Sequence, residues 1–260
     1  MFVAGNHMPH TAIDTAIDIF ARALDDLPNA ERVRFWWRDD DAVARTAQLE
    51  RLLQLQLDLN VPLNLGVVPG LLNRSLVDCL HAYPQVTVLV HGWLHQNHCT
   101  NETSNSEFPL TRPVEDMKTE LANALSTLRQ AFGKQCIPVF VPPWNQFPVD
   151  LEPTLVELGY SGISLGSGGM RGVNFQKQGL IRADTHMEPI NWNTLGLHNV
   201  AASARGFARR LREGSRGPFG LLTHHLAHNP EIWEFSARFW QMISNHERAK
   251  VVSARMIFCP

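Results

Sequence analysis

The sequence predicts an α/β fold with a mainly parallel sheet, and three features of the chain support this. Short apolar runs of strand length alternate with longer segments of helical periodicity along most of the 260 residues. Hydrophobic residues make up 44% of the chain and charged residues 18%, which is enough to form a large buried core. No internal repeat or low-complexity linker divides the sequence, so we expect one domain over residues 1–260. The alternation of strands and helices fits either a closed barrel or a doubly wound sheet.

The expected elements follow from the apolar periodicity, beginning with an amphipathic helix over residues 13–24. The clearest helix is 114–132, because its apolar residues recur on one face. The last helix has a start signal, with Asn229 as N-cap and Pro230 at the first helical position. Strands are expected at 33–37, 62–68, 86–90, 138–141, 162–165, 180–183, 219–223 and 251–257, and the other helices at 48–59, 71–82, 151–158, 200–212 and 231–246.

Composition argues against several classes of protein. The formal net charge is -2, which lacks the basic excess of a nucleic-acid-binding protein. No stretch is long and apolar enough to predict a membrane span. The four cysteines are widely spaced without a Cys-x-x-Cys pair, which predicts reduced thiols. The N-terminus has no basic region followed by an apolar run, and we therefore expect a cytoplasmic protein.

Unusual polar or aromatic residues follow five of the predicted strands. The carboxyl ends of parallel strands share one face of an α/β fold, and binding sites are built there. Core packing does not explain such a pattern, so the sequence predicts a functional site at this face. In chain order the residues are Asp39, Asp40 and Asp41; His91; Pro142, Pro143 and Trp144; His186; and His224 and His225.

The types of residue in this group suit a metal centre. Three successive aspartates repel one another unless a positive charge lies between them, although a solvated turn also favours aspartate. His91 and His95 are four residues apart, which places both rings on one side of a helical turn. With 12 histidines in the chain that spacing alone is weak evidence. One carboxylate and two imidazoles form a three-ligand set with an open position, while a further carboxylate and histidine supply a general base and acid.

Three sequence motifs carry a resemblance to a known family. Trp37-Arg38-Asp39-Asp40-Asp41 is similar to Thr-Phe-Asp-Asp-Gly, and His91-Gly92-Trp93-Leu94-His95 is similar to His-Ser/Thr-x-x-His. Leu222-Thr223-His224 matches Leu-x-His. Two weaker matches are 141–144 to Arg-x-Pro-Tyr and 186–192 to an acidic segment ending in tryptophan. In this order, over most of residues 33–226, the chain resembles the polysaccharide deacetylases of carbohydrate esterase family four.

The resemblance implies a distorted (β/α) barrel of about seven parallel strands with outer helices. It implies one divalent metal ion, most simply zinc, although cobalt, nickel and manganese also suit the ligands. The implied ligands are Asp40, His91 and His95. Asp39 is implied as the catalytic base and His224 as the acid. The resemblance also implies that the N–H of Trp144 binds the oxyanion and that Leu222 and Trp192 line the substrate site. Trp93 lies between the two histidines, where it suits either sugar stacking or the core. Asp41 stands in place of the motif glycine and could hydrogen-bond a metal ligand, and His186 is expected beside the acid.

Two departures from the family pattern belong together. Val141 stands where the family has an arginine, and His186 stands where it has the aspartate that pairs with that arginine. Losing one partner of a buried ion pair costs several kcal/mol, roughly 3–5, whereas losing both is tolerated. His224 is therefore expected to be oriented by His186 or Glu188.

The sequence thus predicts a metal-dependent hydrolase that removes an N-acetyl or other acyl group from a sugar, glycan or glycan precursor. Two alternatives remain open: hydrolysis of another C–N bond in a small molecule, and a carbohydrate-binding relative without catalysis. Retention of the acidic and histidine residues of the motifs favours an enzyme, and the missing arginine favours the non-catalytic relative. A sugar or glycan is the expected partner, without nucleic acid or membrane span, and the sequence predicts no particular oligomeric state.

Overall fold

The computed structural model describes residues 11–28, 31–100, 104–166, 179–215 and 217–259. Its main sheet contains the strands β1 (Val33–Ala42), β2 (Leu63–Val67), β3 (Thr87–His91), β4 (Cys136–Val141), β5 (Gly162–Ile163), β6 (Ile181–Arg182), β7 (Thr185–Met187), β10 (Phe219–Thr223) and β11 (Ala249–Val251). The strands β8 (Ile190–Asn191) and β9 (Gly196–Leu197) form a separate antiparallel pair. The helices are α1 (Ala12–Asp25), α2 (Ala47–Leu59), α3 (Arg74–Leu80), α4 (Val114–Phe132), α5 (Glu152–Glu157), α6 (Val200–Arg212), α7 (Pro230–Asn245) and α8 (Ala254–Phe258).

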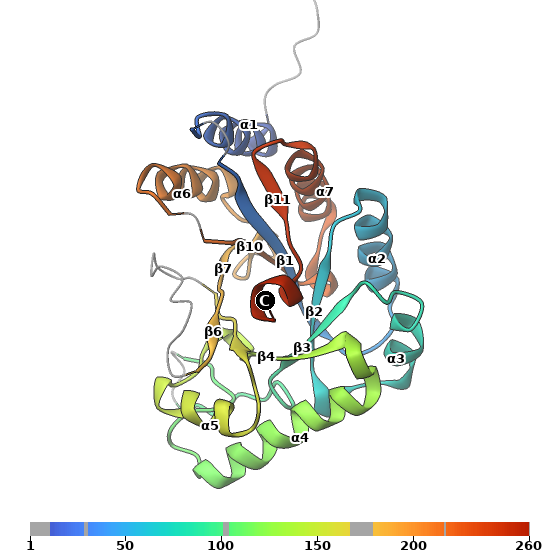
Figure 1. Cartoon of the computed structure of the whole chain (residues 1–260). Helices are drawn as coiled ribbons and strands as arrows, with labels where there is room; N and C mark the ends of the chain where they lie inside the picture. Colours follow the sequence, from blue (N-terminus) through green and yellow to red (C-terminus); the bar gives the residue numbers. More distant parts are fainter. Residues whose placement is uncertain (1–10, 29–30, 101–103, 167–178, 216, 260) are drawn as a thin grey trace, which may run out of the picture.

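The main sheet is curled into a distorted barrel. Its strand order is β6-β5-β4-β3-β2-β1-β10-β7, with every pairing parallel and with β11 added at the start of β1. The two ends of this order, β6 and β7, are separated by two residues of one extended segment, and Gly166 bridges to Thr185 beside them. Figure 1 shows the helices α1 to α7 arranged around the strands, with α8 at the centre of the view. The predicted barrel is therefore confirmed, and the doubly wound alternative is excluded.

Two apolar layers hold this arrangement together. The larger one lies between the strands and the outer helices and includes Phe20, Phe35 and Phe239. The smaller one fills the barrel interior around Trp36. Helix α8 closes this interior, and the ring of its Phe258 meets Trp36 edge-on with centroids 6.1 Å apart. The barrel is thus a packed core, and the opposite end is left for the site.

The predicted strand 251–257 is wrong, because the chain forms β11 only as far as Val251 and then turns into α8. Ser253 caps this helix through its hydroxyl, which accepts from the N–H of Met256 at 3.3 Å. The side chain of Asn64 on β2 accepts from the N–H of Ala254 at 2.8 Å. These two caps satisfy backbone donors that a continued strand would have used in the sheet.

Strand β1 is longer than predicted and continues through all three aspartates. Its side chains alternate, so that Trp36 faces the barrel interior whereas Trp37 faces the outer helices. Alternation places Asp40 on the inner side and Asp39 on the outer side. The register with β2 shifts between Asp39 and Ala42, where Asp41 has a φ of 69°. This bulge re-aims Asp41, so that two consecutive aspartates face the same end of the barrel.

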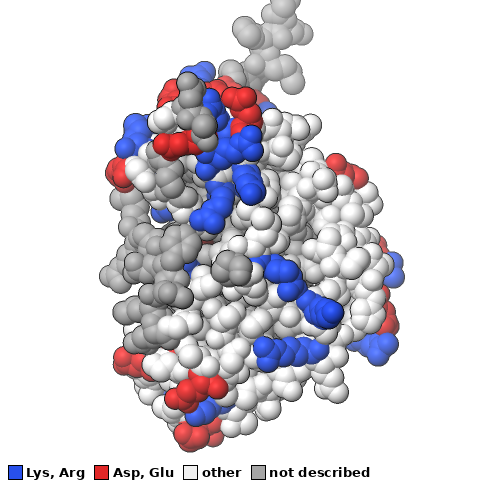
Figure 2. All heavy atoms as spheres, viewed as in Figure 1, with Lys and Arg blue, Asp and Glu red and all other residues white. Residues whose placement is uncertain are grey.

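Surface features of the described part agree with the composition. Figure 2 shows the barrel end closed by α8, where several Lys and Arg side chains lie near the centre and Asp and Glu side chains lie towards the margins. Among the described residues, no helix has the length and apolar character needed to cross a bilayer. All four cysteines are free thiols.

Candidate metal centre

A cavity of about 420 Å³ opens at the carboxyl ends of the strands. Residues from the ends of β1, β3 and β10 line it, together with the turn after β4 and the segment after β7. The structure therefore brings together side chains that lie almost 200 residues apart in the chain. The lining residues are Asp40, Asp41, His91, His95, Asn105, Trp144, Asn145, Glu188, Trp192 and His224.

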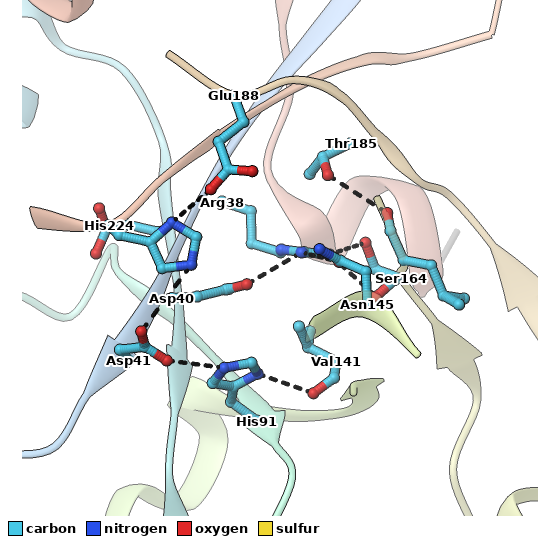
Figure 3. Close-up of polar contacts among 12 residues, drawn as sticks. Arg38, Asp40, Asp41, His91, Val141, Asn145, Ser164, Thr185, Glu188 and His224 are labelled. Carbon is cyan, nitrogen blue, oxygen red and sulfur yellow. Dashed lines mark hydrogen bonds and ion pairs between the residues drawn. The ribbon is translucent and has the colours of Figure 1, made fainter. Parts of the chain in front are cut away.

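Three of these side chains converge closely enough to hold one metal ion. Asp41 Oδ1 lies 3.0 Å from His91 Nε2 and 3.4 Å from His95 Nε2, and the three candidate ligand atoms are all within 4.8 Å of one another. Figure 3 shows Asp41 between His91 and His224, with Asp40 turned towards Arg38. The structure thus places Asp41 in the position predicted for Asp40, because the bulge in β1 turns Asp41 towards the histidines.

The chemistry of this set fits a divalent cation. His91 Nδ1 donates to the carbonyl of Val141 at 2.9 Å, which leaves Nε2 of a neutral ring as an acceptor that faces an acceptor oxygen of Asp41. Two acceptors 3.0 Å apart need a proton or a cation between them. Burial opposes protonation of His91, but the carboxylates of Asp40 and Asp41 raise its pKa above the usual value. The same surplus of negative charge attracts a metal, and the set leaves a coordination position open.

The segment between the two histidines is a tight loop, and the expected helical turn does not form. Both Gly92 and His95 have positive φ, of 60° and 56°. The buried carboxylate of Glu107 accepts from the N–H groups of Trp93 at 3.0 Å and Leu94 at 2.6 Å. A Cβ atom at Gly92 would lie 2.0 Å from this carboxylate, so only glycine fits there. Glu107 therefore fixes the loop that carries the second histidine.

We expect Glu107→Gln to bind zinc about 10–100-fold more weakly, because an amide nitrogen would face a backbone N–H and loosen the loop behind His95. Competition against a chromophoric chelator measures this affinity. Glu157→Gln, which alters an exposed carboxylate paired with Lys118, is the matched control and should bind like the wild type. An unchanged affinity in Glu107→Gln would contradict the role of this carboxylate.

Asp40 lines the cavity and forms an ion pair with a buried arginine. Its Oδ2 lies 3.0 Å from Arg38 Nη2, and both side chains are almost fully buried. Its Oδ1 is buried without a hydrogen-bond partner among the described residues. Gly66 on β2 leaves room for this oxygen, because a Cβ atom there would lie 2.5 Å from it. A carboxylate oxygen without a protein partner, on a residue that lines a cavity, is a candidate proton acceptor.

Asp39, predicted as the catalytic base, faces away from the cavity. Its carboxylate is fully buried and accepts from the Thr223 hydroxyl at 2.6 Å, from the His225 N–H at 3.0 Å and from His225 Nδ1 at 2.5 Å. The cause is strand alternation, which puts Asp39 on the side of β1 that faces the outer helices. Asp39 instead fixes the residues that flank His224.

His224 lies at the cavity with both ring nitrogens near carboxylates. Nδ1 is 3.1 Å from Glu188 Oε1, and Nε2 is 4.0 Å from Asp41 Oδ2. Burial opposes protonation, but the hydrogen bond to Glu188 and the charges of Asp40 and Asp41 raise the pKa of His224 to about 9. The same Glu188 oxygen accepts from Trp192 Nε1 at 2.8 Å. Glu188 is therefore the residue that orients His224, one of the two possibilities expected from the sequence.

His186, the other possibility, has a different place. Its ring stacks on Phe219 with centroids 5.2 Å apart, and its Nδ1 accepts from the N–H of Gly220 at 3.1 Å. Burial, aided by the charge of Arg210, lowers the pKa of His186 to about 3. His186 is thus a neutral packing residue beside the site.

The other predicted substrate residues are divided between two cavities and the core. Trp192 is half-exposed at the main cavity, with its ring 4.9 Å from that of His224. Leu222 lines a second cavity of about 310 Å³, which shares Trp144, Asn145 and Glu188 with the first. The side chain of Trp93 packs against the hydrophobic core and does not line either cavity.

Comparison with known proteins relates this architecture to solved structures. No family model matches the chain, and no curated protein matches its sequence. A structure from Mycobacterium smegmatis, assigned as a polysaccharide deacetylase, superposes with a TM-score of 0.68 at 14% identity, covering 89% of this chain and 91% of the other. The chain has the fold of the polysaccharide deacetylases. The resemblance expected from the motifs is thereby confirmed at the level of the fold.

Two further structures support the same assignment of fold. A family 4 acetyl xylan esterase from Clostridium thermocellum, in complex with a cobalt ion, has a TM-score of 0.54 at 16% identity, over 87% of this chain and 90% of the other. The peptidoglycan deacetylase PdaC from Bacillus subtilis, as a mutant, has a TM-score of 0.56 at 9% identity, over 89% and 92%. The polysaccharide deacetylase fold thus accommodates sequences that share few residues with this chain.

Proposed function

We propose that the chain is a metal-dependent hydrolase that removes an N-acetyl or other acyl group from a sugar, glycan or glycan precursor. The observation that carries this proposal is the convergence of Asp41, His91 and His95 in a cavity that is also lined by Asp40, which has an oxygen without a partner among the described residues, and by His224. A ligand set, a proton acceptor and a proton donor are the parts that hydrolysis of an amide or ester requires.

The proposed roles are shifted by one residue from those expected from the motif. Asp41, in place of Asp40, would hold the metal with His91 and His95, and Asp40, in place of Asp39, would be the base. When bound, a divalent ion supplies Lewis-acid polarisation of the carbonyl and lowers the pKa of a water molecule. Zinc is our first candidate because two imidazoles and a carboxylate are a common catalytic zinc set.

The chain's own residues account for the proton transfers. Asp40 Oδ1 accepts a proton from the attacking water, and its other oxygen stays paired with Arg38. His224 Nε2 donates a proton to the leaving group, while the carboxylate of Glu188 lies 3.1 Å from Nδ1 on the far side of the ring and stabilises its positive charge. The N–H of Trp144, in a turn of positive φ after β4, would stabilise the oxyanion.

The half-exposed ring of Trp192 beside His224 offers an apolar face against which a sugar ring can stack. Glycans are the substrates named for the Clostridium thermocellum and Bacillus subtilis proteins of the same fold. Leu222 and the second cavity lie next to the proposed reaction centre, and we propose that they receive the acyl side of the substrate.

The test combines metal analysis with acetate release from N-acetyl sugars, chitooligosaccharides, peptidoglycan fragments and acetylated xylan. We expect about one zinc ion per chain, acetate release, and loss of activity on chelation that zinc restores. Asp41→Asn should lose most of the metal, because an amide is a much weaker ligand, whereas the exposed Asp78→Asn should retain it. A chain that binds no divalent metal would refute the proposal, and metal binding without acyl release would refute the substrate class.

A further inference from the structure

Arg38 is a buried arginine on the inner face of β1, two residues before Asp40. Its side chain is fully buried, and its guanidinium group reaches across the barrel end. Nη1 donates to the carbonyl of Ser164 at 3.0 Å and to its hydroxyl at 2.7 Å. Nη2 donates to Asn145 Oδ1 at 2.7 Å and lies 3.0 Å from Asp40 Oδ2. Within the described residues, Asp40 is the carboxylate in ion-pair contact with this cation.

The origin of this arginine differs from the family pattern described above. Val141, at the end of β4, is buried in the barrel interior at the position where the family has its arginine. Strands β4 and β1 are separated in the sheet by β3 and β2. The guanidinium group of Arg38 therefore extends into the barrel from a different strand than the one that carries Val141. The second side of the guanidinium meets neutral oxygens of Ser164 and Asn145. Arg38 therefore needs no second carboxylate as a partner, and the neutral His186 at the position of the family's aspartate is consistent with this.

The contacts of Arg38 determine where Asp40 points. Pairing with Arg38 holds Asp40 Oδ2 inside the barrel, and the other oxygen of this cavity-lining residue has no partner among the described residues. Arg38 is itself fixed by Ser164 on one edge and by Asn145 on the other. A side chain held at both edges is a rigid support, and displacement of a reacting group by about 1 Å can cost roughly 100-fold in rate.

We propose that Arg38 is the positioning residue for Asp40 and replaces, from β1, the arginine that the family carries at the position of Val141. This inference rests on the proposed function, in which Asp40 takes the proton from water. It also explains how the chain dispenses with both members of the family's ion pair without losing a site for the base.

The test compares Arg38→Gln and Arg38→Lys with the wild-type protein in metal content, kcat, KM and crystal structure. We expect Arg38→Gln to retain the metal and KM but to lose about 100-fold in kcat, and Arg38→Lys to recover part of this loss through its single cationic contact. In the crystal structure of Arg38→Gln, Asp40 should rotate from its place while Asp41, His91 and His95 remain. Arg182→Gln, which removes an arginine paired with Asp184 elsewhere on the barrel, is the matched control and should keep wild-type kcat.

A second measurement separates positioning from simple stabilisation. Adding Arg38→Gln to Asp40→Asn should not lower the residual kcat further, because Arg38 acts through Asp40. Additive losses, or an Arg38→Gln protein with wild-type kcat, would overturn the proposal. If the wild-type protein hydrolysed no substrate, the proposed function would fail by itself. The position of Asp40 in the crystal structure of Arg38→Gln would then decide the inference, and an unmoved carboxylate would overturn it.

Discussion

Asp40→Asn is expected to bind metal like the wild-type protein and to lose about 100- to 10,000-fold in kcat, the usual contribution of a general base. The substitution keeps the size of the side chain but removes its ability to accept a proton at Oδ1, the oxygen without a protein partner. Asp40 forms an ion pair with Arg38 and is not among the three converging ligands, so the metal site should remain intact. Steady-state kinetics and metal analysis on the same preparation measure the two effects.

Asp41→Asn provides the contrast to Asp40→Asn. Both change one carboxylate to an amide at adjacent positions, but only Asp41 faces both His91 and His95. Asp41→Asn should lose metal and turnover together, and Asp40→Asn should lose turnover alone. If Asp40→Asn lost the metal while Asp41→Asn retained it, Asp40 would be the metal ligand, as the motif in the sequence first indicated.

The comparison of these aspartates shows what strand-end reasoning can predict. Polar residues after the predicted strands were expected to meet at one face, and the structure places Asp40, Asp41, His91 and His224 around one cavity there. The types of residue at the ends of the strands were therefore enough to predict a candidate metal site at this face. The proposed role of each aspartate depends on the register of β1, and the structure places Asp41, one residue after the ligand expected from the motif, beside both histidines.

The alternation of side chains along a strand could have predicted which aspartates face the inside of the barrel. A side chain two residues from Asp40 lies on the same side of a strand, so Arg38 at that spacing indicates an inner-facing pair, whereas Asp39 belongs to the other side. The bulge at Asp41 was not predictable, because a positive φ at a non-glycine residue leaves no mark in the sequence. The predicted strand 33–37 ended too early to include any of these residues.

Other parts of the site depend on contacts between distant segments. Glu107 lies in the polar loop after the histidines, and only the folded chain shows that its carboxylate binds the backbone beside His95. Ser164 and Asn145 reach Arg38 from two other strand ends, and nothing local in either segment predicts an arginine partner. Helix α8 was predicted as part of a strand, because its apolar residues suit a buried strand equally well.

Asp39→Ala should have the largest effect on stability among the three aspartates. It removes the acceptor of three buried hydrogen bonds and leaves the Thr223 hydroxyl proton and two donors of His225 without an acceptor, which we expect to lower the free energy of unfolding by about 3–5 kcal/mol. Chemical denaturation with an unchanged m-value measures this loss. The exposed Asp78→Ala, which breaks a surface pair with Arg74, is the control and should stay within about 0.5 kcal/mol.

Comparison of Asp39→Ala with Asp39→Asn decides between the two assignments of the base. His225 follows His224 directly, so loss of the bond between Asp39 and His225 should also disturb the acid, and kcat should fall together with stability. In the milder Asp39→Asn, an amide oxygen can still accept one of the three hydrogen bonds, and we expect smaller losses of both quantities. An Asp39→Asn protein with wild-type stability and abolished turnover would instead identify Asp39 as the proton acceptor, because a structural residue cannot lose its function while the fold that it supports is unchanged.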